Sequence, residues 1–138
     1  IELIWVASKS KKYYFNYEMG KLLNNGKQMR NLWEINAQRH ITEHPTEKPE
    51  NLIERILLLG SKQNDMVLDP FMGSGTTGLI ARRLNRNFIG IELEKGFFKI
   101  SEERISNEKN NKKIVLSDKK IIQDQEKAKE IISFIEEN

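Results

Sequence analysis

Residues 67–78, VLDPFMGSGTTG, and residues 88–92, FIGIE, decide the fold of this chain. Apolar residues at 66–68 predict a short buried strand, and the glycine-rich run after them leads into a helix predicted over 76–84. Residues 88–91 predict a second strand. Strand, helix and strand in this order indicate an α/β fold in which the two strands pair in parallel through a right-handed crossover.

The glycine-rich run and two carboxylates form a pattern typical of nucleoside-cofactor sites. Gly73, Gly75 and Gly78 spell G-x-G-x-x-G between a predicted strand and a predicted helix, which is the context that gives this pattern meaning. Asp69 ends the first strand. Glu92 follows Gly73 by 19 residues, close to the spacing of about 20 expected for a carboxylate that binds a ribose. We therefore expect a nucleoside cofactor here.

The charges of this site favour S-adenosylmethionine (AdoMet) over a dinucleotide. A pyrophosphate binds bare backbone N–H groups at the positive end of a helix, and the Asp69 carboxylate would repel it. AdoMet has no phosphate; it carries an ammonium and two ribose hydroxyls, which match Asp69 and Glu92. Pro70 also has no backbone N–H, so it removes one of the donors that a pyrophosphate would bind. The alternative with a different function is a dinucleotide-binding oxidoreductase domain. The alternative without a cofactor is a glycine-rich turn in which the two acids only cap the backbone.

Two motifs in a particular order resemble those of a known enzyme family. Residues 69–77 resemble motif I of the amino-directed DNA methyltransferases, and HPTEKP at residues 44–49 resembles their motif X. Motif X followed by motif I is similar to the permuted β group, in which the catalytic half precedes the cofactor half. Residues 14–18 and 26–35 resemble a region of the adenine methylases of that group. The resemblance covers roughly residues 3–106.

The resemblance implies a Rossmann-like, AdoMet-dependent methyltransferase sheet, of which this chain holds the C-terminal part. It implies that Asp69, with the turn through Phe71 and Gly73, holds the ammonium side of the cofactor's methionine and that Glu92 bonds the ribose. Two pairs of residues would face the cofactor carboxylate: Thr46 with Lys48, and Thr76 with Thr77. The whole predicted cofactor-binding set is Thr46, Lys48, Asp69, Pro70, Phe71, Gly73, Gly75, Thr76, Thr77 and Glu92.

The residues that perform the chemistry are missing from the sequence. The family accepts the protons of the target amine and stacks the flipped base with an Asp/Asn/Ser-Pro-Pro-Tyr/Phe motif, whereas Pro45, Pro49 and Pro70 are the only prolines here. The chain also begins at Ile1, inside an apolar run and without Met. We therefore expect a C-terminal part of a longer protein, without catalytic residues, that binds cofactor weakly and does not methylate alone. A non-catalytic cofactor- and DNA-binding subunit of a split enzyme is the alternative.

Basic residues gather in the N-terminal part of the chain. Residues 1–42 carry seven Lys or Arg against three Glu, interleaved with aromatic side chains, within a net charge of +3. This pattern suits a polyanion, although a solvated surface over core aromatics would look the same. The residues predicted to contact DNA are Lys9, Lys12, Lys27, Gln28 and Arg30. Lysines suit phosphates, and Gln28 and Arg30 suit base edges.

With its upstream half, the chain is expected to methylate an exocyclic amino group of duplex DNA, with adenine N6 favoured by the resemblance. The expected partners are DNA, the upstream catalytic half in the same or another chain, and a second copy of this chain. Residues 1–43 would end the catalytic and target-recognition region, 44–106 would form the AdoMet-binding unit, and 107–138 would add a helical extension.

The remaining elements follow from periodicity and turn signals. Expected strands cover residues 2–7, read as buried, 12–15 and 114–116. Expected helices cover residues 17–23, 49–60, 95–105 and 121–135.

The composition excludes several classes of protein. A chain of 138 residues has room for one domain. The absence of Cys excludes disulfides and thiolate sites, and two His leave little for a metal centre, so no metal is expected. Charged residues make up 31% of the chain, and no apolar run approaches the length of about 18 residues that predicts a membrane span. We therefore expect no membrane partner and a soluble, cytoplasmic protein.

Overall fold

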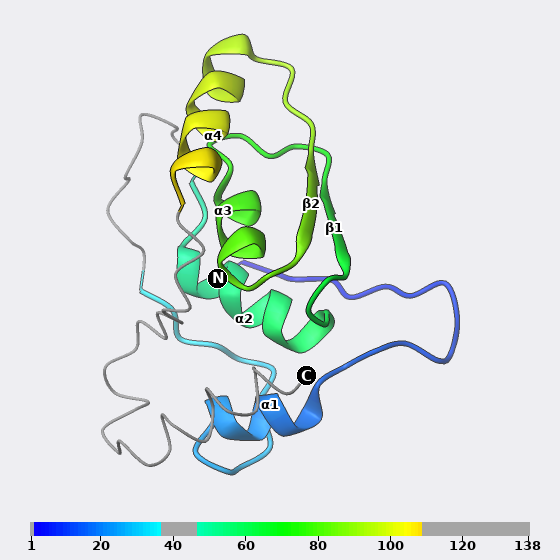
Figure 1. Cartoon of the computed structure of the whole chain (residues 1–138). Coiled ribbons are helices and arrows are strands. Elements are labelled where there is room, and N and C mark those ends of the chain that lie inside the picture. The colour runs from blue at the N-terminus through cyan, green and yellow to red at the C-terminus, as the bar shows by residue number, and fades with distance from the viewer. Residues whose placement is uncertain (1, 37–46, 109–138) are drawn as a thin grey trace.

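The computed structural model describes residues 2–36 and 47–108, and over these residues a short parallel sheet is packed against helices (Figure 1). The predictions for residues 114–116 and 121–135 lie outside the described residues. The elements in chain order are α1 (Tyr17–Leu23), α2 (Glu50–Gly60), β1 (Met66–Asp69), α3 (Thr76–Arg83), β2 (Asn87–Gly90) and α4 (Lys95–Asn107).

The two strands pair in parallel, as the sequence predicts. Their register places Met66 opposite Asn87 and Asp69 opposite Gly90. α3 connects the strands and packs against both of them, and α4 packs against α3 (Figure 1). Because the strands run in the same direction, the segments that follow them leave the sheet at the same edge. The glycine-rich run begins at this edge.

The core lies where α1, α2 and α3 meet. Its buried members are Met19, Leu23, Leu57, Leu58, Ile80, Ala81 and Leu84. From the sheet, Val67 and Phe88 pack against this cluster. α1 begins at the predicted residue because the Asn16 side chain accepts a hydrogen bond from Met19 N at 3.0 Å, which caps the helix. In α2 the predicted apolar stripe is buried only in part: Leu57 lies in this core and Ile53 packs against it, whereas Leu52 and Ile56 are half-buried.

The predicted strands at residues 2–7 and 12–15 are wrong. The structure assigns neither stretch to a strand, and the apolar side chains of residues 3–6 are between 51% and 86% exposed. A strand requires a hydrogen-bonded neighbour, and the two strands in the described part of the chain pair only with each other. An apolar run indicates a tendency to be buried but does not supply the partner.

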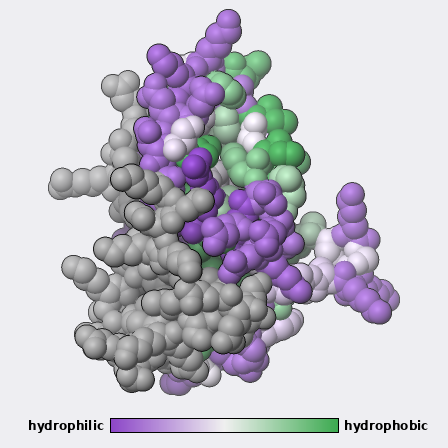
Figure 2. Space-filling model, in the orientation of Figure 1, coloured by the Kyte–Doolittle hydropathy of each residue, from purple (hydrophilic) through white to green (hydrophobic). Residues whose placement is uncertain are grey.

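β1 forms as predicted but is buried on one side only. Met66 and Leu68 are 60% and 59% exposed, whereas Val67 between them is half-buried. In β2, Ile89 is 49% exposed. Figure 2 shows hydrophobic atoms at the surface on the side of the molecule where Figure 1 places the two strands. The expectation of a buried strand is therefore wrong for one face of β1, which is apolar and exposed among the described residues.

Two kinds of feature are absent from the part of the chain that the structure describes. None of the helices there is long and apolar enough to cross a membrane. In the same ranges, no group of three His, Cys, Asp or Glu side chains is arranged to hold a metal ion.

Candidate functional site

The loop between β1 and α3, residues 70–75, is called the glycine loop below, and it is tied to the chain that leaves β2. Ile91 N donates to Asp69 O at 2.9 Å, and Ile91 O accepts from Met72 N at 3.0 Å. Gly75 N then donates to Met72 O at 2.8 Å and closes a turn directly before α3. The loop that the sequence predicts to bind cofactor is therefore fixed by the segment after β2 and by the turn before α3.

Glycine is required in this loop for two separate reasons. Gly73 and Gly75 have φ values of 52° and 81°, in the left-handed region that strains other residues. Gly75 also lies against α4, where an added Cβ would stand 2.7 Å from Ser101 Cβ. Ser101 is completely buried. The loop conformation and the close approach of α4 thus both depend on Gly75.

Asp69 stands at the end of β1, where the sequence predicts it. Its Oδ1 accepts a hydrogen bond from Phe71 N at 3.1 Å, across Pro70, which has no N–H to offer. The Asp69 side chain is half-buried, and Phe71 is 89% exposed. The carboxylate therefore shapes the turn, while the neighbouring aromatic ring faces solvent.

Glu92 links the glycine loop to the chain beyond β2. Its Oε2 accepts from Gly73 N at 2.9 Å, and its Oε1 accepts from Glu94 N at 2.8 Å. Carboxylate oxygens also accept hydrogen bonds from hydroxyls such as those of a ribose. Backbone N–H bonds of this kind would also anchor an ordinary turn, so they leave the ribose assignment a prediction.

The residues predicted to face the cofactor carboxylate differ in burial and in partners. Thr76 is buried as the first residue of α3, and Thr77 is half-buried beside it. Lys48 Nζ lies 2.9 Å from Glu2 Oε1, in an ion pair whose two side chains are each at least half exposed. This pair lowers the pKa of Glu2. Thr46 lies outside the described residues.

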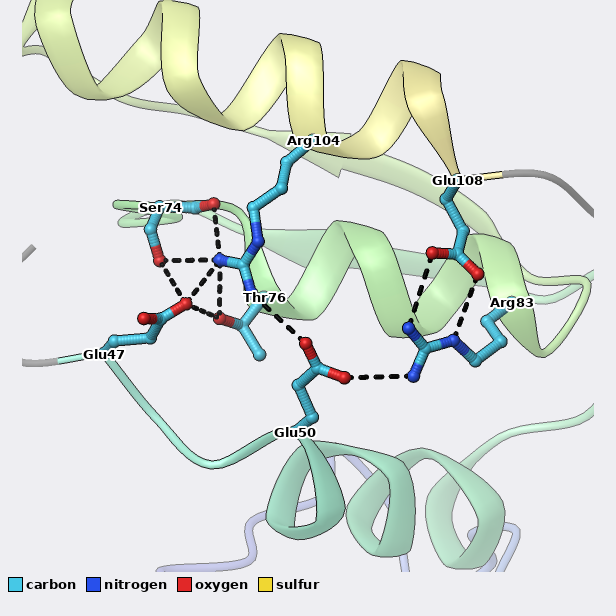
Figure 3. A network of polar contacts seen from close by, with 7 residues as sticks. All are labelled: Glu47, Glu50, Ser74, Thr76, Arg83, Arg104 and Glu108. Carbon is cyan, nitrogen blue, oxygen red and sulfur yellow. Dashed lines mark hydrogen bonds and ion pairs between the residues drawn. The ribbon is translucent and has the colours of Figure 1, made fainter. Parts of the chain in front are cut away.

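Sequence reasoning missed two charged residues that reach the glycine loop, Glu47 and Arg104 (Figure 3). Glu47 Oε1 accepts from Ser74 Oγ at 3.3 Å and from Thr76 Oγ1 at 3.5 Å, and it is ion-paired with Arg104. Glu47 lies inside the motif X-like sequence at residues 44–49, so this motif could have indicated it. Arg104 carries no such local signal, because its partners come from other elements.

Two further charged residues, Glu54 of α2 and Arg83 of α3, lie away from solvent. Glu54 is 3% exposed, its Oε1 has no hydrogen-bond partner among the described residues, and burial raises its pKa to about 7 despite the charge of Arg83. Arg83 itself pairs with Glu50 at 3.0 Å and Glu108 at 3.2 Å. Burial opposes the charge of Arg83, but these carboxylates outweigh it and raise its pKa.

The residues predicted to contact DNA are all exposed. They are Lys9, Lys12, Lys27, Gln28 and Arg30. Lys27 and Gln28 follow a fixed turn, because the Asn24 side chain donates to their carbonyl oxygens at 3.2 and 2.8 Å. Arg30 O accepts from Trp33 Nε1 at 2.9 Å. Lys9 and Lys12 stand in a separate segment without helix or strand.

Comparison with known proteins gives one family and several relatives. The family model described as DNA methylase matches residues 1–103. Type II methyltransferase M2.LlaDCHI of Lactococcus lactis subsp. cremoris is 46% identical over 110 residues, which cover 75% of this chain and 41% of the relative. Type II methyltransferase M2.DpnII of Streptococcus pneumoniae is 46% identical over 112 residues, with 77% and 42% covered.

A solved structure extends this comparison to the fold. The crystal structure of the M1.HpyAVI-SAM complex is 39% identical and has a TM-score of 0.54, with 68% of this chain and 44% of that chain covered. This likeness confirms the α/β fold predicted for the glycine loop and its strands. The chain spans about two fifths of the length of the relatives named above.

Proposed function

The chain belongs to the DNA methylase family, and we propose that it supplies the cofactor-binding part of an enzyme that methylates DNA. The resemblance to the amino-directed DNA methyltransferases of the β group is confirmed by the family match and by the Type II methyltransferase relatives. AdoMet is the proposed cofactor and duplex DNA the proposed substrate. The observation that carries the proposal is the arrangement of Asp69, the glycine loop and Glu92 at one edge of the sheet.

This arrangement suits AdoMet by charge and by hydrogen bonding. AdoMet supplies an electrophilic methyl group on a sulfonium, and it also carries a positive ammonium. Asp69 places a half-buried negative charge at the carboxyl end of β1, where ligands of open α/β sheets bind. Glu92 places a second carboxylate beside the glycine loop, and carboxylate oxygens accept hydrogen bonds from hydroxyls such as those of a ribose. The crystallised relative M1.HpyAVI, named as a SAM complex, supports the same choice of cofactor.

The base-modifying residues are proposed to come from outside this sequence. The family motif with two adjacent prolines is absent from residues 1–138. The upstream catalytic half, in the same or another chain, would accept the amine protons and hold the flipped base. Adenine N6 is the proposed target, on the resemblance of residues 14–18 and 26–35 to adenine methylases.

Binding of the cofactor can be tested on the chain itself. Calorimetry with AdoMet and, separately, with NAD should give heat of binding for AdoMet only. Binding of NAD with no response to AdoMet would replace the proposal with the dinucleotide-binding alternative.

Catalysis requires a separate assay. Transfer of radiolabelled methyl groups to DNA should be undetectable with this chain alone and should appear when a fragment carrying the two-proline motif is added. Turnover by this chain alone would contradict the proposed division of labour. If no turnover appears after the fragment is added although AdoMet still binds, the alternative is favoured in which this chain is a non-catalytic subunit of a split enzyme.

A further inference from the structure

Arg104 connects α4 to the glycine loop through several hydrogen bonds (Figure 3). Its Nη1 donates to Ser74 O at 3.0 Å, to Ser74 Oγ at 3.1 Å and to Thr76 Oγ1 at 3.4 Å. The bond to Ser74 O holds the loop backbone itself, between the two glycines with left-handed φ. Arg104 stands just beyond residues 1–103, which the family model matches.

Two acids complete the surroundings of this guanidinium. Glu47 pairs with Arg104 and accepts from the Ser74 and Thr76 hydroxyls, and Glu50 Oε1 lies 3.3 Å from Arg104 Nη2. The side chains of Glu47 and Arg104 are only 7% and 14% exposed. Solvent therefore screens this pair weakly, and the bonds are of the stronger, charge-assisted kind. One guanidinium thus joins the segment before α2, the glycine loop and α4.

We propose that Arg104 is a positioning residue that holds the glycine loop in the conformation that binds cofactor. This inference rests on the proposed function, because it assigns a role to the loop in binding AdoMet. Gly73 and Gly75 give the free loop a wide choice of conformations. Arg104 removes that choice before the cofactor arrives, and a site that is already ordered binds with less entropic loss.

Arg83 provides a matched control in the same network. It is 13% exposed, close to the 14% of Arg104, and it also joins two carboxylates, Glu50 and Glu108. Its hydrogen bonds go to these acids and not to the glycine loop. Replacing Arg83 therefore removes a comparable buried ion pair and leaves the loop contacts in place.

The test compares Arg104→Gln, Arg104→Lys and Arg83→Gln with the wild-type chain. Calorimetry with AdoMet should show binding weakened about tenfold in Arg104→Gln, the effect of losing a bond to a charged group. Arg104→Lys, which keeps the charge and loses the planar fork, should recover part of the affinity. Arg83→Gln should stay within about twofold of wild type at a similar loss of thermal stability.

Hydrogen exchange gives a readout that needs no cofactor. The amides of Gly73 and Gly75 should exchange faster in Arg104→Gln than in Arg83→Gln. Should Arg104→Gln fail to fold, Arg104→Lys carries both comparisons.

Three results would overturn the role of Arg104. They are wild-type AdoMet affinity in Arg104→Gln, equal weakening by Arg104→Gln and Arg83→Gln, and equal loop exchange in these two variants. A wild-type chain that binds no AdoMet would instead overturn the proposed function, and the cofactor role of Arg104 with it.

Discussion

At the scale of single residues, the glycine loop shows how one position can meet two demands. Gly75 has a φ of 81° and lies against Ser101 of α4. A larger residue there would be strained by its backbone and blocked by its neighbour. Gly96 of α4 is different, because an added Cβ would meet nothing within 4 Å.

Gly75→Ala should therefore destabilise the fold by at least about 1–2 kcal/mol, from backbone strain alone. Gly96→Ala should be neutral or stabilising by up to about 1 kcal/mol, because alanine favours helix over glycine. Urea unfolding followed by circular dichroism measures both variants. Equal midpoints for the two would show that the left-handed conformation of Gly75 is not required.

Glu54 is a residue whose charge state affects stability. In the unfolded chain it has an ordinary carboxyl pKa near 4.5, and in the fold burial raises its pKa to about 7. Between these values the unfolded chain loses the proton and the folded chain keeps it. The contribution of Glu54 to stability should therefore fall as the pH rises from 4.5 to 7, by an amount of order 3 kcal/mol.

Glu54→Gln should remove this pH dependence, because glutamine does not titrate. The difference in unfolding free energy between the variant and the wild type should grow in favour of the variant from about pH 5 to about pH 8. Glu18→Gln, at an exposed residue paired with Lys21, serves as the control. A difference that stays constant across this range would mean that the Glu54 carboxyl titrates normally in the fold.

At the scale of elements, the described helices could be predicted from the sequence more fully than the strands. The stripe in α2, the cap at Asn16 and the glycine-rich run are local signals, and each element forms where its signal stands. The apolar run at 2–7 failed because pairing depends on a distant neighbour. For the same reason the sequence predicted Asp69 and Glu92 but not Arg104, whose partners come from other elements.

Arg86 is a further element-scale contact that no local pattern predicts. It is 8% exposed, and it donates to Ser61 Oγ at 3.2 Å, to Ser61 O at 2.8 Å and to Leu84 O at 2.6 Å. Ser61 is the C-cap residue of α2, and Leu84 is the C-cap residue of α3. Arg86 therefore joins the ends of two helices ahead of β2.

Arg86→Lys should destabilise the fold by about 2–3 kcal/mol, because a single ammonium cannot reach both helix ends in the geometry of the guanidinium. Arg82→Lys, at a half-buried residue in the last turn of α3, should change stability by about 0.5 kcal/mol or less. Thermal unfolding of the two variants gives the comparison. Similar melting temperatures for both would mean that the Arg86 bonds contribute little.

At the scale of the whole molecule, the described residues present two different surfaces. One side of the sheet is apolar and exposed at Met66, Leu68 and Ile89 (Figure 2). The residues proposed to contact DNA are exposed in the N-terminal part, outside the sheet. Cofactor and DNA would thus be bound by different segments of the chain.

If Lys27 contacts a DNA phosphate, Lys27→Ala should weaken binding to all sequences alike. The slope of log affinity against log salt should become about one unit shallower. Lys99→Ala, at an exposed lysine of α4, is the matched control and should leave the slope unchanged. Fluorescence anisotropy over a salt series measures both variants. An unchanged slope for Lys27→Ala would show that Lys27 is a solvated surface residue that makes no phosphate contact.

We propose that Asp69 and Glu92 hold AdoMet at the edge of the sheet. The most direct measurement is calorimetric titration of AdoMet into Asp69→Asn and Glu92→Gln, with Asp65→Asn as control because Asp65 also accepts a backbone N–H, from Lys62 at 2.8 Å. Both site variants should bind AdoMet at least about tenfold more weakly than wild type, and Asp65→Asn should bind it unchanged. Wild-type affinity in both site variants would contradict the claim and leave the two carboxylates as turn anchors.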